Sequence, residues 1–166
     1  MRALPLLALL ALLACARLPA ALAPAPEPLH LADLAGEGDA ERRTSMRLVL
    51  QGLDADSEGR PDLARGGYEN ALRVDPSNPY AYLALARYHA EGASPERALS
   101  FLDRTSALLE AQGARSPRVE PHLEGLRGAA LLAGGRAAEA RPHLERARAL
   151  APSAWNDGRL SARELR

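Results

Sequence analysis

A chain of 166 residues has the length of one domain, and because 47% of its residues are apolar it can form a core. The apolar residues are mostly Ala and Leu, with no Ile and only three Val, which favours helices over strands. Its 21 Arg balance its 21 Asp and Glu, and loss of Arg2 with a signal segment leaves a net charge of 20 − 21 = −1. A chain with so small a net charge has no long-range electrostatic field that would attract nucleic acid or an anionic membrane.

The N-terminus is typical of a secretory signal. Met1-Arg2-Ala3 is a short basic region, and residues 4–14 form an apolar run that is too short to cross a bilayer stably. We therefore predict a signal peptide over residues 1–14. Residues 11–15, Ala-Leu-Leu-Ala-Cys, resemble the bacterial lipobox, in which the cysteine becomes the first mature residue and carries acyl chains.

Cys15 is the only cysteine of the chain, so no intramolecular disulfide competes for it. The lipobox resemblance implies lipidation at Cys15 and an anchor in the membrane, since each buried CH₂ contributes about 0.8 kcal/mol. In lipoproteins of this kind, Ala rather than Asp after the cysteine permits export to the outer membrane. The expected location is thus the bacterial cell envelope, facing the periplasm. Two alternatives stay open: an ordinary cleaved signal that releases a soluble protein, and an uncleaved anchor.

Residues 15–39 are rich in Ala and Pro and supply little for a core. Alternating prolines, as in Ala23-Pro24-Ala25-Pro26, stiffen a chain toward polyproline II. We predict that this segment is a tether between the lipidated cysteine and a folded domain at residues 40–154. Within the tether, residues 30–34 could dock on the first helix.

Helix starts and stops recur through the folded domain at one spacing. The offset is 34 residues, with an eight-residue insertion at 113–120 before the last unit. Two small-residue positions fall in register: Ala64, Ala98 and Ala140, and Gly52, Ala86 and Gly128. A fixed period of this size indicates stacked supersecondary units, each of which we expect to be a pair of helices. Asp39 or Thr44, Asn78 and Ser94 are the expected helix caps.

These positions carry a resemblance to the tetratricopeptide repeat family over three units, residues 45–78, 79–112 and 121–154. The matching residues are Gly52, Ala64, Tyr68, Ala71 and Pro76, then Tyr82, Ala86, Ala98 and Leu102, then Gly128, Ala140, Leu144, Ala147 and Pro152. The chain departs from the family at Thr105 and Glu110, among others. The resemblance implies an all-α fold, a right-handed α-α superhelix of three helix-turn-helix repeats. The alternative is a bundle of helical hairpins without a superhelix.

Residues 155–166 are expected to form a C-terminal cap, because an array otherwise exposes the apolar side of its last repeat. Trp155, Leu160 and Leu165 can cover that side, and Ser161-x-x-Glu164 is the pattern of a capping box. A partner-binding Trp155 is the alternative. Pro142 falls inside the last long helix, where we expect a bend.

The first helix of each pair lines the concave face of such an array. The repeat register places eight residues there that we predict to form a protein-binding groove: Met46, Val49, Leu53, Tyr80, Leu83, Arg87, His122 and Leu132. Four more share the face: Asp56, Glu91, Gly125 and Ala129. The strip is apolar at its centre with Tyr and Arg beside it, residue types that are enriched at binding hot spots. An amphipathic helix or an extended peptide could bind there. Alternatively, residues 29–34 cover part of the strip, or it is solvated.

No pattern in the chain points to catalysis. The four His do not stand at zinc-ligand spacing, and there is no Gly-x-Ser-x-Gly nucleophile elbow. We therefore predict a non-catalytic scaffold without cofactor or metal, which binds another protein or peptide of the envelope and resembles in layout the pilot and assembly lipoproteins of envelope complexes. The alternative function is a soluble secreted or periplasmic accessory subunit of an enzyme or transport complex; a catalytic protein ranks third.

Overall fold

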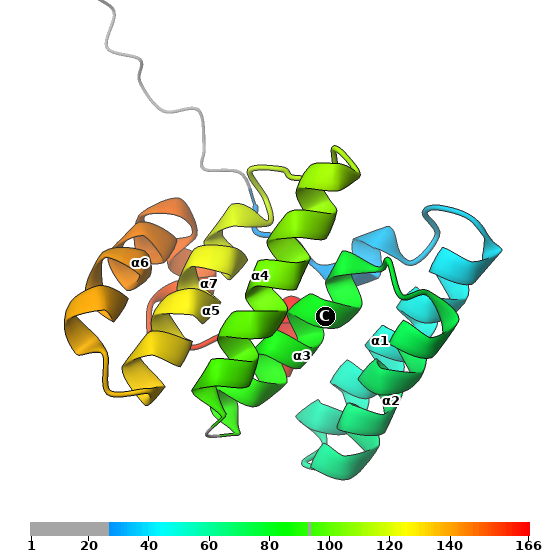
Figure 1. Cartoon of the computed structure of the whole chain (residues 1–166), viewed down its shortest axis with the longest axis horizontal. Coiled ribbons are helices and arrows are strands. Elements are labelled where there is room, and N and C mark those ends of the chain that lie inside the picture. The colour runs from blue at the N-terminus through cyan, green and yellow to red at the C-terminus, as the bar shows by residue number, and fades with distance from the viewer. Residues whose placement is uncertain (1–26, 93) are drawn as a thin grey trace, which may run out of the picture.

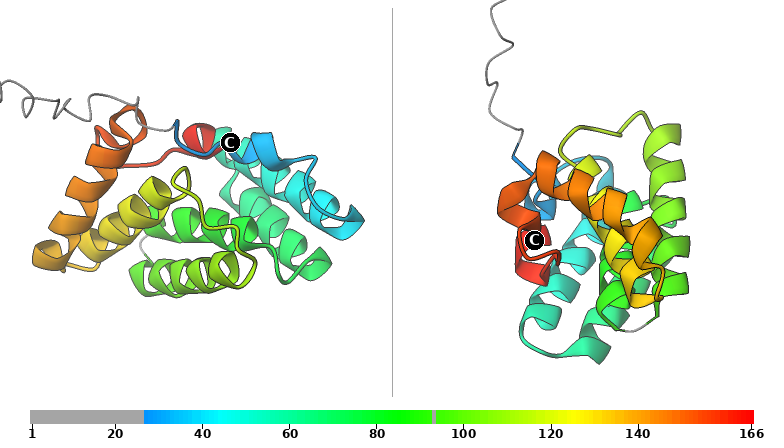
Figure 2. Two further views of the ribbon diagram at one scale, coloured as in Figure 1. Left: turned by 90° about the horizontal axis from the view of Figure 1, so that it is seen from above. Right: turned by 90° about the vertical axis from the view of Figure 1, so that its left-hand side faces the viewer.

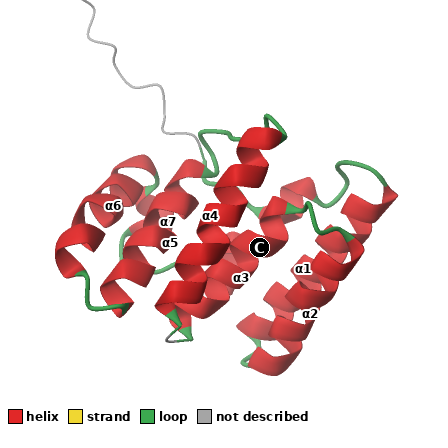
Figure 3. Cartoon of the chain, in the orientation of Figure 1, coloured by secondary structure: helices red, strands yellow, loops and turns green. Residues whose placement is uncertain are grey.

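The computed structural model describes residues 27–92 and 94–166, so the predicted signal peptide, Cys15 and the first part of the tether lie outside the described residues. Within the described part, helices are joined by loops and no strand occurs (Figure 3). The all-α class that the composition predicted is confirmed.

Six long helices make up most of the described chain. They are α1 (Ala40–Ser57), α2 (Pro61–Val74), α3 (Pro79–Glu91), α4 (Pro95–Ala111), α5 (Glu120–Ala133) and α6 (Ala137–Leu150). Three single turns accompany them: η1 (Leu31–Leu34), α7 (Pro152–Trp155) and α8 (Ala162–Leu165).

The long helices pack as three consecutive hairpins (Figure 1). The pairs are α1 with α2, α3 with α4, and α5 with α6. Neighbouring hairpins meet through α2 and α3 and through α4 and α5, while α3 also contacts both α1 and α5. Helices α1, α3 and α5 therefore form a continuous row, and in Figure 2 the two ends of the chain lie along one side of the helices.

Glycine permits the close approach of the paired helices in the first and third hairpins. A Cβ added at Gly52 would lie 2.5 Å from the Tyr68 ring, and one added at Gly128 would lie 2.7 Å from the Leu144 side chain. Each partner follows its glycine by the same interval (68 − 52 = 144 − 128 = 16). The aligned Ala64, Ala98 and Ala140 are all buried. The aligned glycines therefore meet the side chain sixteen positions later in both the first and the third hairpin.

A second pair of aligned positions brings a hydroxyl near a carbonyl across each of the first two hairpins. In the first, the Ser45 hydroxyl donates to the Ala71 carbonyl at 2.9 Å. In the second, Pro79 and Thr105 occupy the aligned positions. The single hydroxyl hydrogen of Thr105 is donated to the Phe101 carbonyl of its own helix at 2.9 Å, and the Thr105 oxygen lies 3.4 Å from the Pro79 carbonyl. The two positions are therefore close in both hairpins, and a short hydrogen bond joins them in the first.

Helix boundaries follow local chemistry. Asp39 caps α1 by accepting from the Arg42 amide at 2.8 Å, and Asn78 caps α3 by accepting from the Tyr80 amide at 3.0 Å. The predicted capping box of Ser161 and Glu164 is present at α8. Ser94 precedes α4 as expected, but its side chain makes no capping bond. Helix α6 continues through Pro142 without interruption.

Two glycine substitutions test the register of the first hairpin. Gly52→Ala should lower the free energy of unfolding by about 1–3 kcal/mol, because the added methyl group overpacks the contact between α1 and α2. Gly66→Ala is the matched control: its Cβ would meet nothing within 4 Å. That change should raise stability by roughly 0.5–1 kcal/mol through helix propensity. Urea denaturation measures both, and equal effects would contradict the close approach at Gly52.

Candidate functional site

The eight residues that the sequence assigned to a groove lie on α1, α3 and α5, but most of them are buried. Six expose no more than 1% of their surface: Met46, Val49, Leu53, Leu83, Arg87 and His122. Tyr80 is half-buried, and Leu132 is 52% exposed. Most of the predicted groove is therefore covered. The alternative in which residues 29–34 cover part of the strip describes this arrangement, and the other end of the chain covers more of it.

The first cover is an N-terminal strap, residues 27–34. Leu29 and Leu31 are buried, and the Leu29 amide donates to the Arg118 carbonyl at 3.1 Å. Arg118 belongs to the loop that the sequence marked as an insertion, and its side chain forms an ion pair with Asp33 at 2.6 Å. The predicted tether of residues 15–39 is thus too long: from Leu29 onward the chain is part of the folded domain.

The strap also engages α5 through His122. The ring Nε2 lies 2.8 Å from the Leu29 carbonyl oxygen, and because a carbonyl can only accept, Nε2 carries the hydrogen. Burial lowers the pKa of His122 to about 4, so the ring is neutral at physiological pH. Its other nitrogen, Nδ1, is buried without a partner in the described part of the chain.

The second cover is a C-terminal tail, residues 156–166. Leu160 and Leu165 are buried, and the one-turn helix α8 packs on α1. Arg166 forms an ion pair with Asp54 of α1, and its carbonyl accepts from the Ala32 amide of the strap at 2.6 Å. The predicted cap therefore crosses to the first hairpin and does not cover the last repeat alone.

Arg87 of α3 lies under the tail with a side chain that is 1% exposed. Its guanidinium forms ion pairs with Asp56 of α1 and with Glu91, one turn further along α3. Its Nη1 also lies 3.5 Å from the Leu160 carbonyl of the tail. A buried charge needs such partners, because removing an ion from water costs several kcal/mol.

Tyr68 joins this buried group from α2. Its hydroxyl donates to Asp56 at 3.2 Å. The pKa of Tyr68 is raised, mainly by burial and also by the Asp56 carboxylate, while Arg87 acts in the opposite direction. The hydroxyl therefore stays protonated and remains a donor to Asp56. Three helices, α1, α2 and α3, are linked at this point.

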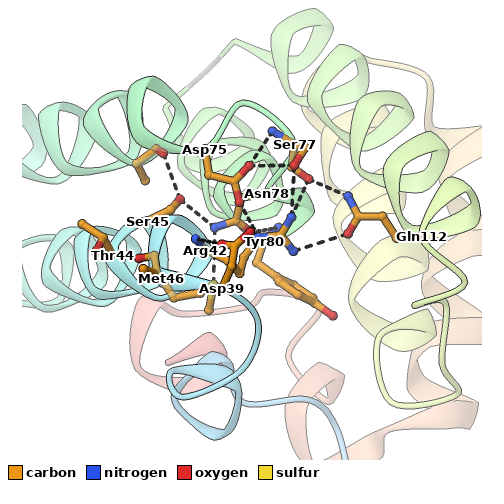
Figure 4. A network of polar contacts seen from close by, with 12 residues as sticks. Asp39, Arg42, Thr44, Ser45, Met46, Asp75, Ser77, Asn78, Tyr80 and Gln112 are labelled. Carbon is orange, nitrogen blue, oxygen red and sulfur yellow. Dashed lines mark hydrogen bonds and ion pairs between the residues drawn. The ribbon is translucent and has the colours of Figure 1, made fainter.

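A second polar network joins the first two hairpins at the turn between α2 and α3 (Figure 4). Arg42 of α1 forms an ion pair with Asp75 and donates to the Ser77 carbonyl at 3.1 Å. Burial alone would raise the pKa of Asp75, but hydrogen bonds from Arg42 and Ser77 outweigh it and lower the pKa. Gln112, from the end of the second hairpin, donates to the same Ser77 carbonyl at 2.7 Å. This network is structural: it fixes the turn.

Trp155 is fully buried, which removes it from contact with a partner. The absence of a side chain at Gly125 of α5 makes room for the indole ring, since a Cβ there would lie 2.2 Å from a ring carbon. The indole Nε1 has no hydrogen-bond partner among the described residues. The alternative of a partner-binding Trp155 does not hold in this arrangement, and the residue starts the tail on its path over the concave face.

One part of the concave face stays open beside the tail. We call it the concave cavity; its volume is about 570 Å³. It is lined by Arg87, Ala90, Glu91, Leu126, Ala129, Leu132, Ala133, Gly158, Arg159 and Leu160. The wall from α5 is apolar, and among the described residues no carboxylate pairs with Arg159 at the tail side.

The sequence identified the α3 and α5 walls of this cavity through the repeat register. It missed the third wall, Gly158 to Leu160, because only tertiary packing brings the tail there. The apolar Leu160 in a polar, Gly-containing stretch was the available signal that the tail covers something. Its destination could not be derived from spacing.

Elsewhere, chemistry-bearing groups are dispersed in the described residues. No set of three or more His, Cys, Asp or Glu side chains gathers there in a geometry that could hold a metal. A smaller cavity of about 170 Å³ between α2, α3 and α4 is lined in part by Arg65, Arg97, Glu69 and His89. Burial and the neighbouring Arg97 lower the pKa of His89, whose ring stacks on Phe101. Its role is therefore in packing.

Comparison of the chain with models of known protein families, with curated proteins and with solved structures gives no match.

The buried His122 predicts an acid-sensitive stability. Its pKa in the folded state, about 4, lies below its unfolded value of about 6.5, so the folded state disfavours the protonated ring. The stabilisation is complete above pH 6.5 and is lost as the pH falls toward 4, by up to about 3 kcal/mol at 1.36 kcal/mol for each pH unit.

Urea denaturation between pH 7.5 and 4 measures this loss. His122→Gln should flatten the fall in unfolding free energy over that window. Identical pH profiles for His122→Gln and the unaltered chain would contradict a buried neutral imidazole.

Proposed function

We propose that the described domain is a tetratricopeptide-type array, a right-handed superhelix of three hairpins, that acts as a protein-interaction scaffold without catalysis. The support is the recurrence of the same contacts at aligned positions. Gly52 and Gly128 each admit the residue sixteen positions later, and the aligned pairs Ser45 with Ala71 and Pro79 with Thr105 lie close to each other in the first and second hairpins.

The observation that carries the binding proposal is the concave cavity with Leu132 at its wall. Leu132 and Leu63 are the large hydrophobic residues that stand out as exposed in the described chain, at 52% and 59%. Leu132 is surrounded by apolar neighbours of α5, and Arg159 lies at the same opening. An apolar anchor with an acidic neighbour, carried on a helix or an extended segment of a partner protein, would match this surface.

We further propose that the protein is a lipoprotein of the bacterial envelope, anchored through Cys15 and facing the periplasm from the outer membrane. This rests on residues 1–15, outside the described residues. Within the described part, no helix combines the length and the hydropathy that crossing a bilayer requires. The partner is then another protein or peptide of the envelope, and an assembly or pilot role for an envelope complex fits this arrangement.

Two exposed leucines provide a matched test of the cavity. Leu132→Asp should reduce recovery of a cross-linked partner about tenfold or more, because a carboxylate is costly to bury against an apolar ligand surface. Leu63→Asp makes the same change at an equally exposed leucine of α2 outside the cavity. In-cell cross-linking and quantitative mass spectrometry compare the same partner across both variants. Equal recovery would argue against the cavity.

The anchor has its own test. Mass spectrometry of the mature N-terminus should find an acylated Cys15, and Cys15→Ser should move the protein from the membrane to the soluble fraction, because the acyl chains supply the apolar area for anchoring. An unmodified N-terminus beyond residue 16 would rule out the lipoprotein and would favour the soluble accessory subunit.

A further inference from the structure

The tail of residues 156–166 has the construction of a bound peptide. Two leucines, Leu160 and Leu165, are 2% and 0% exposed, while Arg159, Ser161 and Arg163 between and beside them face solvent. Its single helical turn is held by its own capping box: the Ser161 amide donates to Glu164 at 2.7 Å, and the Glu164 amide donates to the Ser161 hydroxyl at 3.2 Å. The tail therefore satisfies much of its backbone by itself, and it contacts the domain through two large apolar anchors, through the buried Ala162 and through Arg166 at its end.

Polar contacts of the tail are well formed at its end, where Arg166 pairs with Asp54 and its carbonyl accepts from the Ala32 amide, but they are poorly matched around Leu160. The Leu160 carbonyl lies 3.5 Å from Arg87 Nη1, a long separation for a charge-assisted bond. Beneath the tail, Arg87 Nε is buried and has no hydrogen-bond partner among residues 27–92 and 94–166. Unpaired buried donors are unfavourable. A segment that supplies an acceptor at Arg87 Nε would satisfy a donor that the tail leaves unpaired.

The concave face beside the tail is accessible. The concave cavity borders Gly158, Arg159 and Leu160 on one side and Leu132 on the other. An incoming segment can thus make apolar contacts on α5 before the tail leaves. Because the tail is tethered to the domain, it competes with an incoming segment at an effective concentration in the ~mM range.

We propose that the tail is a resident ligand of the concave face, and that the partner binds through a segment of the same chemistry, two leucine-like anchors five residues apart, by displacing it. This inference rests on the proposed protein-binding function and adds its regulation: the face is closed until the partner outcompetes the chain's own end. Arg87, uncovered when Leu160 leaves, then donates to a carbonyl or carboxylate oxygen of the incoming segment.

The test uses the full-length chain and a fluorescein-labelled peptide of residues 156–166. Leu160→Asp with Leu165→Asp detaches the tail, because both carboxylates would have to be buried. The matched control carries Asn156→Asp with Arg163→Asp, two acidic changes at exposed positions of the same tail. Fluorescence anisotropy should show the peptide binding the leucine variant at least tenfold more tightly than the unaltered chain or the control.

A peptide in which both leucines are aspartate should bind none of these proteins. Two results would overturn the inference. In the first, the peptide of residues 156–166 binds the unaltered chain, the control and the Leu160→Asp/Leu165→Asp variant equally well. In the second, it does not bind that variant although the variant keeps the helical circular dichroism of the unaltered chain. Two further results would together overturn the inference: the unaltered chain elutes as a dimer, and cross-links join the tail of one copy to the other copy. The segment bound to the concave face would then come from a second copy of the chain.

Hydrogen exchange on the unaltered chain tests the inference should the leucine variant unfold. The amides of Leu165 and Arg166 donate to Ser161 and Ala162 at 3.2 and 3.0 Å. If the tail opens on its own, these amides exchange at least a hundredfold faster than those of α3; equal protection would mean that tail and core open together and would refute displacement. The anisotropy and hydrogen-exchange measurements involve no cellular partner and no lipid. Failure of this inference can therefore be distinguished from failure of the cavity test and of the Cys15 test above.

Discussion

A guanidinium buried in the concave face determines how the parts of this domain meet. Arg87 comes from the central hairpin, and its pairing with Asp56 reaches back to the first. Because an unpaired ion at this depth would be strongly unfavourable, α1 cannot slide relative to α3 without separating the pair. The tail lies over the same side chain, with the Leu160 carbonyl toward it. The relative position of the first two hairpins thus depends on this residue, and the tail passes over it.

The two ends of the chain close the concave face together. His122 fixes the strap through the Leu29 carbonyl, and the strap binds the tail through Ala32 and Arg166. The part of the face that remains open is the concave cavity, and the proposed function depends on it.

The sequence was sufficient for the helices and their pairing, because these depend on local rules. Small residues at Gly52 and Gly128 mark close helix contacts, and Asp39, Asn78 and Ser161 mark helix starts through bonds to amides within three residues.

Burial of the predicted groove depends instead on contacts between residues far apart in the chain. Leu29 meets the loop at Arg118, and Arg166 meets Asp54, with no periodic pattern to indicate either contact. Leu29 and Leu31 lay in a stretch whose Pro content indicated a tether, so their place in the core could not be derived from composition. The register placed residues on the correct face without showing whether that face was free.

The closed concave face depends most on the placement of the tail across the first hairpin, which a cross-link measures directly. Asp54 and Arg166 form an ion pair there, and exchanging both for cysteine in a Cys15→Ser chain removes only a surface pair of small energetic value. A short bismaleimide should join the two cysteines within one monomer, as identified by mass spectrometry, whereas Asp54→Cys with Arg141→Cys on α6 should not be joined. Cross-links found only between two chains, or none although both cysteines react with a monofunctional maleimide, would contradict the closed concave face.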